Sequence, residues 1–246
     1  MNFIVHGASG RMGCILTEAI RDGGKHGIAA LVSPEWADAP EEKRYASLSS
    51  VSAAADCVID FSNHAATREL LLWCEEKKLP LVLATTGHTA DEREAIADAA
   101  ERIPIFFSAN MSVGVAVLAT FAKTAAALFP DADIEIVEKH HHNKLDVPSG
   151  TALLLADRIK EARTDAQYVI GRHLDGKRTK TEIGIHAVRI GSEVGTHEIL
   201  ISTGNETITL KHEAENRKLF ADGAIAAAEF LAGKAPGLYT MQDIVS

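Results

Sequence analysis

Hydrophobic and polar positions in the first 110 residues alternate between short apolar runs and amphipathic segments. The apolar runs predict five strands, at residues 2–6, 28–32, 57–61, 81–84 and 105–107. Helical periodicity predicts a helix that begins near Met12, and two more over 65–77 and 90–102. Strands that alternate with helices indicate an α/β fold in which helices cover both faces of a parallel sheet.

The pattern changes beyond Met111. A long apolar helix is expected over 113–129, followed by a strand over 133–139 and a helix from Ser149 to about 162. Short turns at Gly191-Ser192 and Gly204-Asn205 separate strand-like runs at 182–190, 194–203 and 206–212, which predict a largely antiparallel sheet. A last helix over 219–231 could pack back on the first domain, and the polar stretches 33–52 and 164–180 are expected to be loops.

Composition narrows the class of protein. The chain has 246 residues, 46% of them hydrophobic and 24% charged, as in ordinary soluble globular proteins. Its net charge of -9 argues against nucleic acid or an anionic membrane as the main partner. Three scattered cysteines without a C-x-x-C pattern predict neither a disulfide framework nor a zinc site. No signal peptide or transmembrane segment is expected, so we predict a cytoplasmic location.

A glycine loop, Gly7-x-x-Gly10-x-x-Gly13, follows the first strand and opens the first helix. Glycines in this context permit a tight turn and a close approach of the backbone to a pyrophosphate at the helix N-terminus. The loop therefore predicts a dinucleotide site. A plain strand-to-helix turn is the alternative, because the spacing differs from the commoner G-x-G-x-x-G.

The end of the second strand bears on the choice between NAD and NADP. An acid there would bind the ribose 2′-hydroxyl, but the strand ends at Val32-Ser33 and the first acid is Glu35. Ser33 can bind a hydroxyl or a phosphate oxygen. The cations that could bind a 2′-phosphate are Arg11, Lys43 and Arg44. The interpretation leans slightly to NADPH, with use of both cofactors open.

Residues 138–151, EKHHHNKLDVPSGT, place three histidines and Lys144 directly before a predicted helix. Histidine exchanges protons near neutral pH, and lysine holds a carboxylate or donates a proton. Ser149 is the expected N-cap of a helix whose N-terminus suits an anion. Adjacent histidines on a strand point to opposite faces, so a metal site is disfavoured, and a polar surface turn is the remaining alternative. The segment predicts a site that binds an acidic small molecule and delivers protons to it.

Taken together, these motifs resemble the 4-hydroxy-tetrahydrodipicolinate reductase (dihydrodipicolinate reductase) family over nearly the whole chain. The most specific match is E-x-H-H-x-x-K-x-D-x-P-S-G-T-A at 138–152. Further motifs occur in the family's order at 7–13, 60–62, 85–87 and 108–114. The departure is Val32-Ser33, where many members carry an acid followed by a basic residue.

The resemblance implies a Rossmann domain at 1–111 and 214–246, and a substrate-binding and tetramerisation domain at 112–213. It implies a homotetramer that reduces a small dicarboxylate, 4-hydroxy-tetrahydrodipicolinate, with NAD(P)H in the diaminopimelate and lysine pathway. Two other functions remain as rivals: another nicotinamide oxidoreductase on the same scaffold, and a non-catalytic NAD(P) sensor.

The resemblance also implies roles for single residues. His140 corresponds to the family's proton donor or acceptor and Lys144 to its proton donor, while the residues alone leave open which of them protonates the substrate. The substrate carboxylates are expected at His141, Lys144, Ser149, Gly150 and Thr151. Residues expected to bind the cofactor are Gly7, Ala8, Ser9, Gly10, Arg11 and Met12 at the pyrophosphate, and Ala84, Thr85, Thr86, Ser108, Ala109, Asn110 and Met111 on the nicotinamide side.

Overall fold

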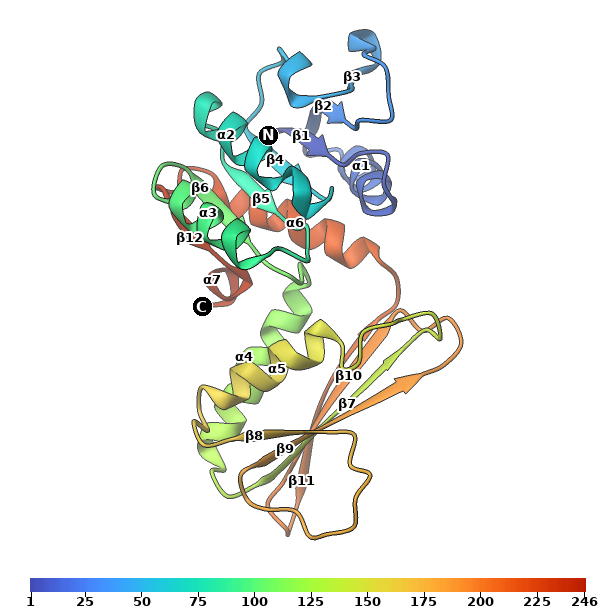
Figure 1. The fold of residues 1–246 in the computed structure, drawn as a ribbon, viewed down its shortest axis with the longest axis vertical. Coiled ribbons are helices and arrows are strands. Elements are labelled where there is room, and N and C mark those ends of the chain that lie inside the picture. The colour runs from blue at the N-terminus through green and yellow to red at the C-terminus, as the bar shows by residue number, and fades with distance from the viewer. The chain divides into compact units, whose positions relative to one another are not determined.

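The computed structural model describes residues 1–246, which divide into two compact units (Figure 1). Unit 1 comprises Met1–Ser112 and Arg217–Ser246, and unit 2 comprises Val113–Asn216. None of the helices combines the length and the apolar character needed to span a lipid bilayer.

Unit 1 is built on a parallel sheet of seven strands in the order β12-β6-β5-β4-β1-β2-β3. The strands are β1 Asn2–His6, β2 Gly27–Val32, β3 Arg44–Tyr45, β4 Cys57–Asp60, β5 Leu81–Leu83, β6 Pro104–Phe107 and β12 Gly237–Tyr239. The chain moves outward from β1 in one direction and from β4 in the other. The carboxyl ends of β1 and β4 therefore form a topological switch point, where open α/β sheets bind ligands.

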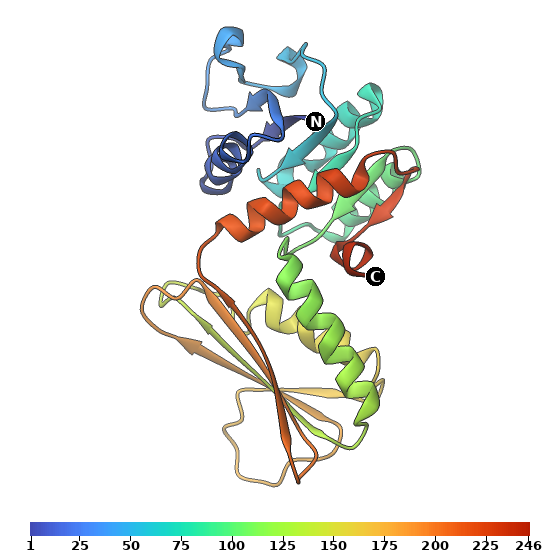
Figure 2. The same cartoon turned by 180° about the vertical axis from the view of Figure 1, so that it is seen from behind.

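Helices cover both faces of this sheet, as the alternation of strands and helices predicts. They are α1 Arg11–Gly23, α2 Thr67–Lys77, α3 Ala90–Ala100, α6 Lys218–Leu231 and α7 Met241–Val245. α2 contacts α3 on one face and α1 contacts α6 on the other, where Figure 2 shows α6 in orange-red. Short 3-10 turns occur at Pro40–Glu42, Leu48–Ser50 and His64–Ala66. The stretch 33–52, expected as a loop, thus contains two of these turns and β3.

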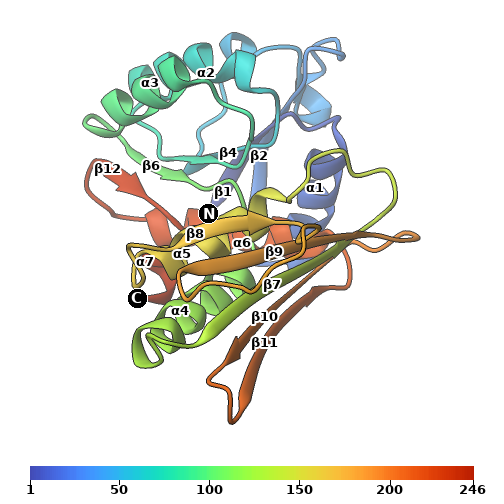
Figure 3. The ribbon, with the colours of Figure 1, turned by 60° about the horizontal axis from the view of Figure 1, so that its bottom comes forward.

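Unit 2 is a five-stranded sheet with α4 Val113–Leu128 and α5 Gly150–Lys160 on one face (Figure 3). The strand order is β11-β10-β7-β9-β8. The strands are β7 Asp133–His140, β8 Gln167–Ile170, β9 Glu182–Arg189, β10 Gly195–Ser202 and β11 Thr207–Ala214. Alternate isoleucines of β7, β9 and β10 point to the helices and form the core with apolar side chains of α4 and α5.

The predicted fold class is confirmed, but two expectations within unit 2 are wrong. The turn at Gly191-Ser192 connects β9 to β10, yet these strands do not pair with each other, because β7 lies between them. β10 runs antiparallel to β7 and β11, whereas β9 runs parallel to β7 and β8. In addition, β8 lies inside the stretch 164–180 that the sequence predicts to be a loop.

Candidate active site

The buried face of β7 begins apolar and ends polar. Ile134, Ile136, Glu138 and His140 alternate along the strand, so their side chains share one face. The isoleucines pack in the core, whereas Glu138 and His140 come at the end of the strand next to the start of α5. A buried acid and histidine are costly unless they are paired, so their partners define the site.

Glu138 is fully buried and lies at the centre of a hydrogen-bonded cluster. Its carboxylate lies 2.5 Å from Nδ1 of His140 and accepts two hydrogen bonds from Arg189, at 2.8 and 2.9 Å. The backbone N–H of Ser149 donates to it at 3.1 Å. Burial alone would raise the pKa of Glu138, but the hydrogen bonds from His140 and Arg189 lower it to about 2. Glu138 is therefore a charged acceptor at neutral pH.

The start of α5 is fixed by Ser149, which is the N-cap that the sequence predicts. Its Oγ accepts a hydrogen bond from the N–H of Ala152 at 3.2 Å and lies 3.1 Å from Nε2 of His197. Burial, together with the charge of His140, lowers the pKa of His197 to about 3, so this histidine is neutral at physiological pH. Gly150 and Thr151 follow Ser149 as the first residues of the helix.

Lys144 belongs to a loop that is tied to the same cluster. Its Nζ pairs with a carboxylate oxygen of Asp146 at 2.8 Å. Burial would raise the pKa of Asp146, but this hydrogen bond and the charge of Lys144 lower it. Arg189 donates to the backbone oxygen of Asp146 at 2.7 Å. The backbone N–H of His141 donates to the backbone oxygen of Glu193 at 2.8 Å. The loop is thus held by β9 and by the turn that follows it.

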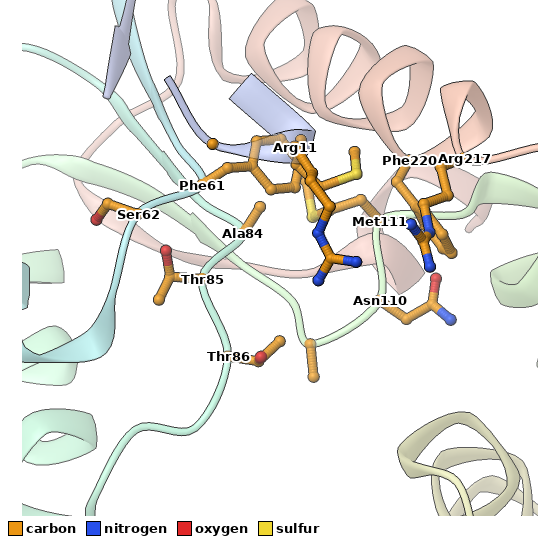
Figure 4. Close-up of a pocket in the computed structure, with 13 residues that line it drawn as sticks. Arg11, Phe61, Ser62, Ala84, Thr85, Thr86, Asn110, Met111, Arg217 and Phe220 are labelled. Atoms are coloured by element: carbon orange, nitrogen blue, oxygen red, sulfur yellow. The ribbon is translucent and has the colours of Figure 1, made fainter. Parts of the chain in front are cut away.

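Unit 1 contains a cavity of about 540 Å³ at the carboxyl ends of its strands (Figure 4). Its lining includes many of the residues expected to bind the cofactor: Gly10, Arg11, Met12, Ala84, Thr85, Thr86, Ala109, Asn110 and Met111. The lining also includes Phe61, Ser62, Arg217 and Phe220, to which the sequence analysis gave no role.

The glycine loop beside this cavity fits a dinucleotide. Gly7 has a φ of 78°, and a Cβ there would lie 2.6 Å from the backbone oxygen of Phe61. A Cβ on Gly13 would collide with the backbone of Gly7 and Ala8. Helix α1 begins after Gly10 without a side-chain cap, so its first N–H groups can bind an anion.

Asp60 holds the loops that line the cavity. This buried residue at the end of β4 lies 2.7 Å from Nδ1 of His6 and accepts a hydrogen bond from the hydroxyl of Thr85 at 2.5 Å. The N–H of Ser62 donates to it at 3.2 Å. One carboxylate therefore joins the ends of β1, β4 and β5 at the switch point.

A polar cluster lies where β2 ends. The hydroxyl groups of Ser9 and Ser33 are 2.6 Å apart, and both donate to the carboxylate of Glu35. Two cations considered for a 2′-phosphate have other partners. Lys43 donates to a backbone oxygen of β2 at 2.7 Å, and Arg44 forms an ion pair with the acid two residues before it.

Gly7, Ala8 and Ser108 were also expected to bind the cofactor, but they are not part of the cavity lining. The N–H groups of Gly7 and Ala8 donate to the backbone oxygen of Val32, and the hydroxyl of Ser108 donates to the backbone oxygen of Asn110 at 2.7 Å.

The three adjacent histidines differ in exposure, since His140 is buried and His142 is exposed. No group of three or more His, Cys, Asp or Glu side chains has an arrangement that could hold a metal ion.

Sequence reasoning missed the partners of His140. Glu138 could have been found, because it alternates with His140 in a strand whose other inward positions are apolar. Arg189 reaches the cluster because it is the register partner of His140 on β9, and no local signal in the sequence gives this register. Arg217 and Phe220 line the cavity from a segment that follows unit 2 in the chain.

Comparisons with known proteins agree along the whole chain. The family model "Dihydrodipicolinate reductase, N-terminus" matches residues 1–111, and the model "Dihydrodipicolinate reductase, C-terminus" matches residues 114–245. The 4-hydroxy-tetrahydrodipicolinate reductase of Caldanaerobacter subterraneus subsp. tengcongensis is 43% identical over 100% of this chain and 98% of its own. That of Clostridium tetani is 44% identical over 98% of this chain and 95% of its own.

A solved structure supports the fold. The dipicolinate-bound dihydrodipicolinate reductase from Paenisporosarcina sp. TG-14 superposes with a TM-score of 0.83 and covers 99% of both chains. At 24% sequence identity, this likeness concerns the arrangement of strands and helices.

Proposed function

The chain belongs to the dihydrodipicolinate reductase family, and on that premise we propose how its residues carry out the family's reaction. The chain is an NAD(P)H-dependent oxidoreductase that reduces 4-hydroxy-tetrahydrodipicolinate to tetrahydrodipicolinate in diaminopimelate and lysine biosynthesis. One observation carries the assignment of roles. The paired Glu138 and His140, with Lys144 close in sequence, adjoin the start of α5 in unit 2, where Ser149 is the N-cap.

Residues 1–111 and 214–246 form the dinucleotide-binding domain in this proposal. The loop from Gly7 to Met12 and the start of α1 hold the pyrophosphate, with Arg11 and Arg217 as cations that line the cavity. The segments 84–86 and 108–111 contact the nicotinamide side. When bound, the reduced nicotinamide supplies the hydride.

We propose that Ser9, Ser33 and Glu35 bind the adenosine ribose. A carboxylate at this place accepts a hydrogen bond from a ribose hydroxyl and repels a 2′-phosphate. The partners of Lys43 and Arg44 also make them poor ligands for that phosphate. The slight preference for NADPH suggested by Val32-Ser33 therefore gives way to a proposal of dual use in which NADH is favoured.

Residues 112–213 bind the substrate, a small dicarboxylate like the dipicolinate in the relative from Paenisporosarcina. Its carboxylates contact His141, Lys144 and the backbone N–H groups at Gly150 and Thr151. Ser149 presents this helix start, because its own hydroxyl is engaged by Ala152 and His197. Binding fixes the ring for hydride addition, so much of the rate gain comes from orientation.

The reduced ring needs a proton, and two groups can exchange it. His140 is the proposed proton donor or acceptor, because the buried carboxylate of Glu138 supports its imidazole. Lys144 is the proposed donor, since its side chain is 22% exposed and already pairs with a carboxylate, that of Asp146.

The assembly and location are also proposals. We propose a homotetramer, because α4 and α5 cover one face of the sheet in unit 2 and leave partly exposed apolar side chains on the other, such as Val137 and Leu200. Light scattering after size-exclusion chromatography would give the mass. A cytoplasmic location fits the free thiols of the three cysteines.

The proposed roles are tested by absorbance at the reduced-nicotinamide band with freshly generated 4-hydroxy-tetrahydrodipicolinate. NADH and NADPH are used in separate assays with the wild type, His140→Gln and Lys144→Ala. Substrate-dependent oxidation by the wild type, and loss of at least about a hundredfold in kcat in either variant, would support the roles. Two folded variants with wild-type turnover would refute them.

A further inference from the structure

We propose that Glu138 is a positioning residue that holds the imidazole of His140 with its proton on Nδ1, which leaves Nε2 to exchange protons with the substrate. This inference rests on the proposed role of His140. Glu138 contacts neither the substrate nor the cofactor in this proposal, and it acts through the ring of His140.

The argument begins with the groups that surround the carboxylate. Two oxygens receive four contacts: Nδ1 of His140 and Nη1 of Arg189 at one oxygen, and Nη2 of Arg189 and the N–H of Ser149 at the other. Arginine and backbone N–H groups only donate. An ionised carboxylate only accepts, so the short contact of 2.5 Å with His140 requires a proton on Nδ1.

The tautomer of neutral His140 follows from this contact. With the hydrogen on Nδ1, the lone pair of the neutral ring is on Nε2, which is the nitrogen that can take or return a proton. Nε2 lies next to Gly195, where an added Cβ would be 3.0 Å away. A glycine at this position of β10 therefore leaves space at the reactive nitrogen.

The other groups around His140 do not replace Glu138. The ring of His197 on β10 stands edge-on at 5.1 Å and is neutral at physiological pH, because burial lowers its pKa to about 3. Arg189 on β9 is charged but is bound to Glu138. The loop charges Lys144 and Asp146 are paired with each other. Glu138 is thus the group that sets the orientation of the ring.

Glutamine in place of Glu138 cannot reproduce this arrangement. Its amide has nearly the same shape but carries two hydrogens where one carboxylate oxygen accepts. One set of donors, from Arg189 with His140 or from Arg189 with Ser149, would then face another donor. Aspartate keeps the charge and both acceptors on a shorter side chain, so it should restore part of the function.

The first test uses the wild-type enzyme alone. Histidine labelled with 15N is measured at about pH 8.5, two units above the ordinary imidazole pKa of about 6.5, and the signals of His140 are assigned by their loss in His140→Gln. The expected result is a protonated Nδ1 and an unprotonated Nε2. A protonated Nε2 would overturn the inference without any Glu138 variant.

The second test compares Glu138→Gln and Glu138→Asp with a matched control. Glu135 lies on the same strand and also binds a histidine and an arginine, His186 at 2.7 Å and Arg178 at 2.8 Å. It has no contact with His140, so Glu135→Gln should keep wild-type turnover. Steady-state kinetics and calorimetric titration with dipicolinate give turnover and affinity separately.

We expect Glu138→Gln to lower kcat at least about tenfold, while KM and the Kd for dipicolinate stay within about threefold. Glu138→Asp should turn over faster than Glu138→Gln. Equal loss of affinity and turnover, or no gain with aspartate, would indicate a merely structural ion pair. If His140→Gln retained turnover, the proposed role of His140 would fail. If Glu138→Gln retained turnover while His140→Gln lost it, the positioning role of Glu138 would fail and the role of His140 would stand.

Discussion

Replacing Asp60 by alanine should destabilise unit 1 and weaken cofactor binding together. The side chain is 1% exposed and joins His6, Thr85 and the N–H of Ser62. A hydrogen bond to a charged group contributes about 1.5–3 kcal/mol, and an unpaired buried partner adds its own cost. Since the contributions are not additive, we expect Asp60→Ala to lower the free energy of unfolding by about 3–5 kcal/mol.

Asparagine at position 60 provides an internal comparison. Its carbonyl oxygen can still accept from His6 and Ser62, and its amide can donate to the hydroxyl of Thr85 once that hydroxyl rotates. The geometry survives while the charge is lost, so we expect Asp60→Asn to cost about 1–2 kcal/mol. The order alanine, asparagine, wild type is therefore the expected order of increasing stability.

Tryptophan fluorescence can follow this unfolding selectively, because both tryptophans, Trp36 and Trp73, belong to unit 1. Urea titration gives the free energy of unfolding, and calorimetric titration gives the Kd for NADH. We expect Asp60→Ala to raise that Kd at least about tenfold, since the loops after β4 and β5 lose their common anchor. Asp98→Ala, at an exposed position on α3, should change stability by less than about 0.5 kcal/mol. Wild-type stability and affinity in Asp60→Ala would refute the reasoning.

Three further predictions concern the two sites. Lys144→Ala should reduce mainly kcat, and His141→Ala should raise mainly KM; steady-state kinetics in which both variants match the wild type would contradict the proposed roles. Glu35→Gln should raise the ratio of kcat/KM for NADPH to that for NADH by about tenfold, because it removes a negative charge beside the 2′-phosphate. An unchanged ratio would contradict the proposal that Glu35 binds the ribose. The folded state holds the pKa of His197 near 3, whereas an unfolded histidine titrates near about 6.5, so the unfolded chain binds a proton first as the pH falls. The free energy of unfolding, followed by circular dichroism, should decline from about pH 6.5 toward 3 by up to about 1.4 kcal/mol per pH unit. His197→Gln should flatten this slope, and an equal slope in both proteins would count against a buried neutral histidine.

The sequence predicts the elements that have strong periodicity and misses those without it. β1, β4 and β5 are apolar runs next to clear turns, so their positions follow from local pattern. The two or three residues of β3 and β12 are too short to show a period, and they form strands because β2 and β6 offer open edges. The insertion of β7 between β9 and β10 is decided by packing across the sheet, which no turn in the sequence encodes.

The candidate site divides in the same way. Residues within one motif, such as His140, Lys144 and Ser149, could be named together because the chain itself brings them close. Arg189 could not, because its place beside Glu138 depends on the register of β9 with β7. The contacts of Glu35 could not be predicted either, because the acid lies beyond the end of β2 and meets Ser9 and Ser33 only in the folded structure.

The division of unit 1 into two chain segments affects the protein while it is being made. β6 ends at Phe107, and its partner β12 begins at Gly237, with the whole of unit 2 between them. A ribosome adds about 5–20 residues per second, so the outer edge of β6 waits on the order of ten seconds for its partner. During that interval its unpaired backbone groups can pair with another chain, as exposed strand edges do. In unit 2 the corresponding wait is shorter, because β7 ends at His140 and its first partner β9 begins at Glu182. The nascent chain is therefore most prone to aggregation in the half that begins first.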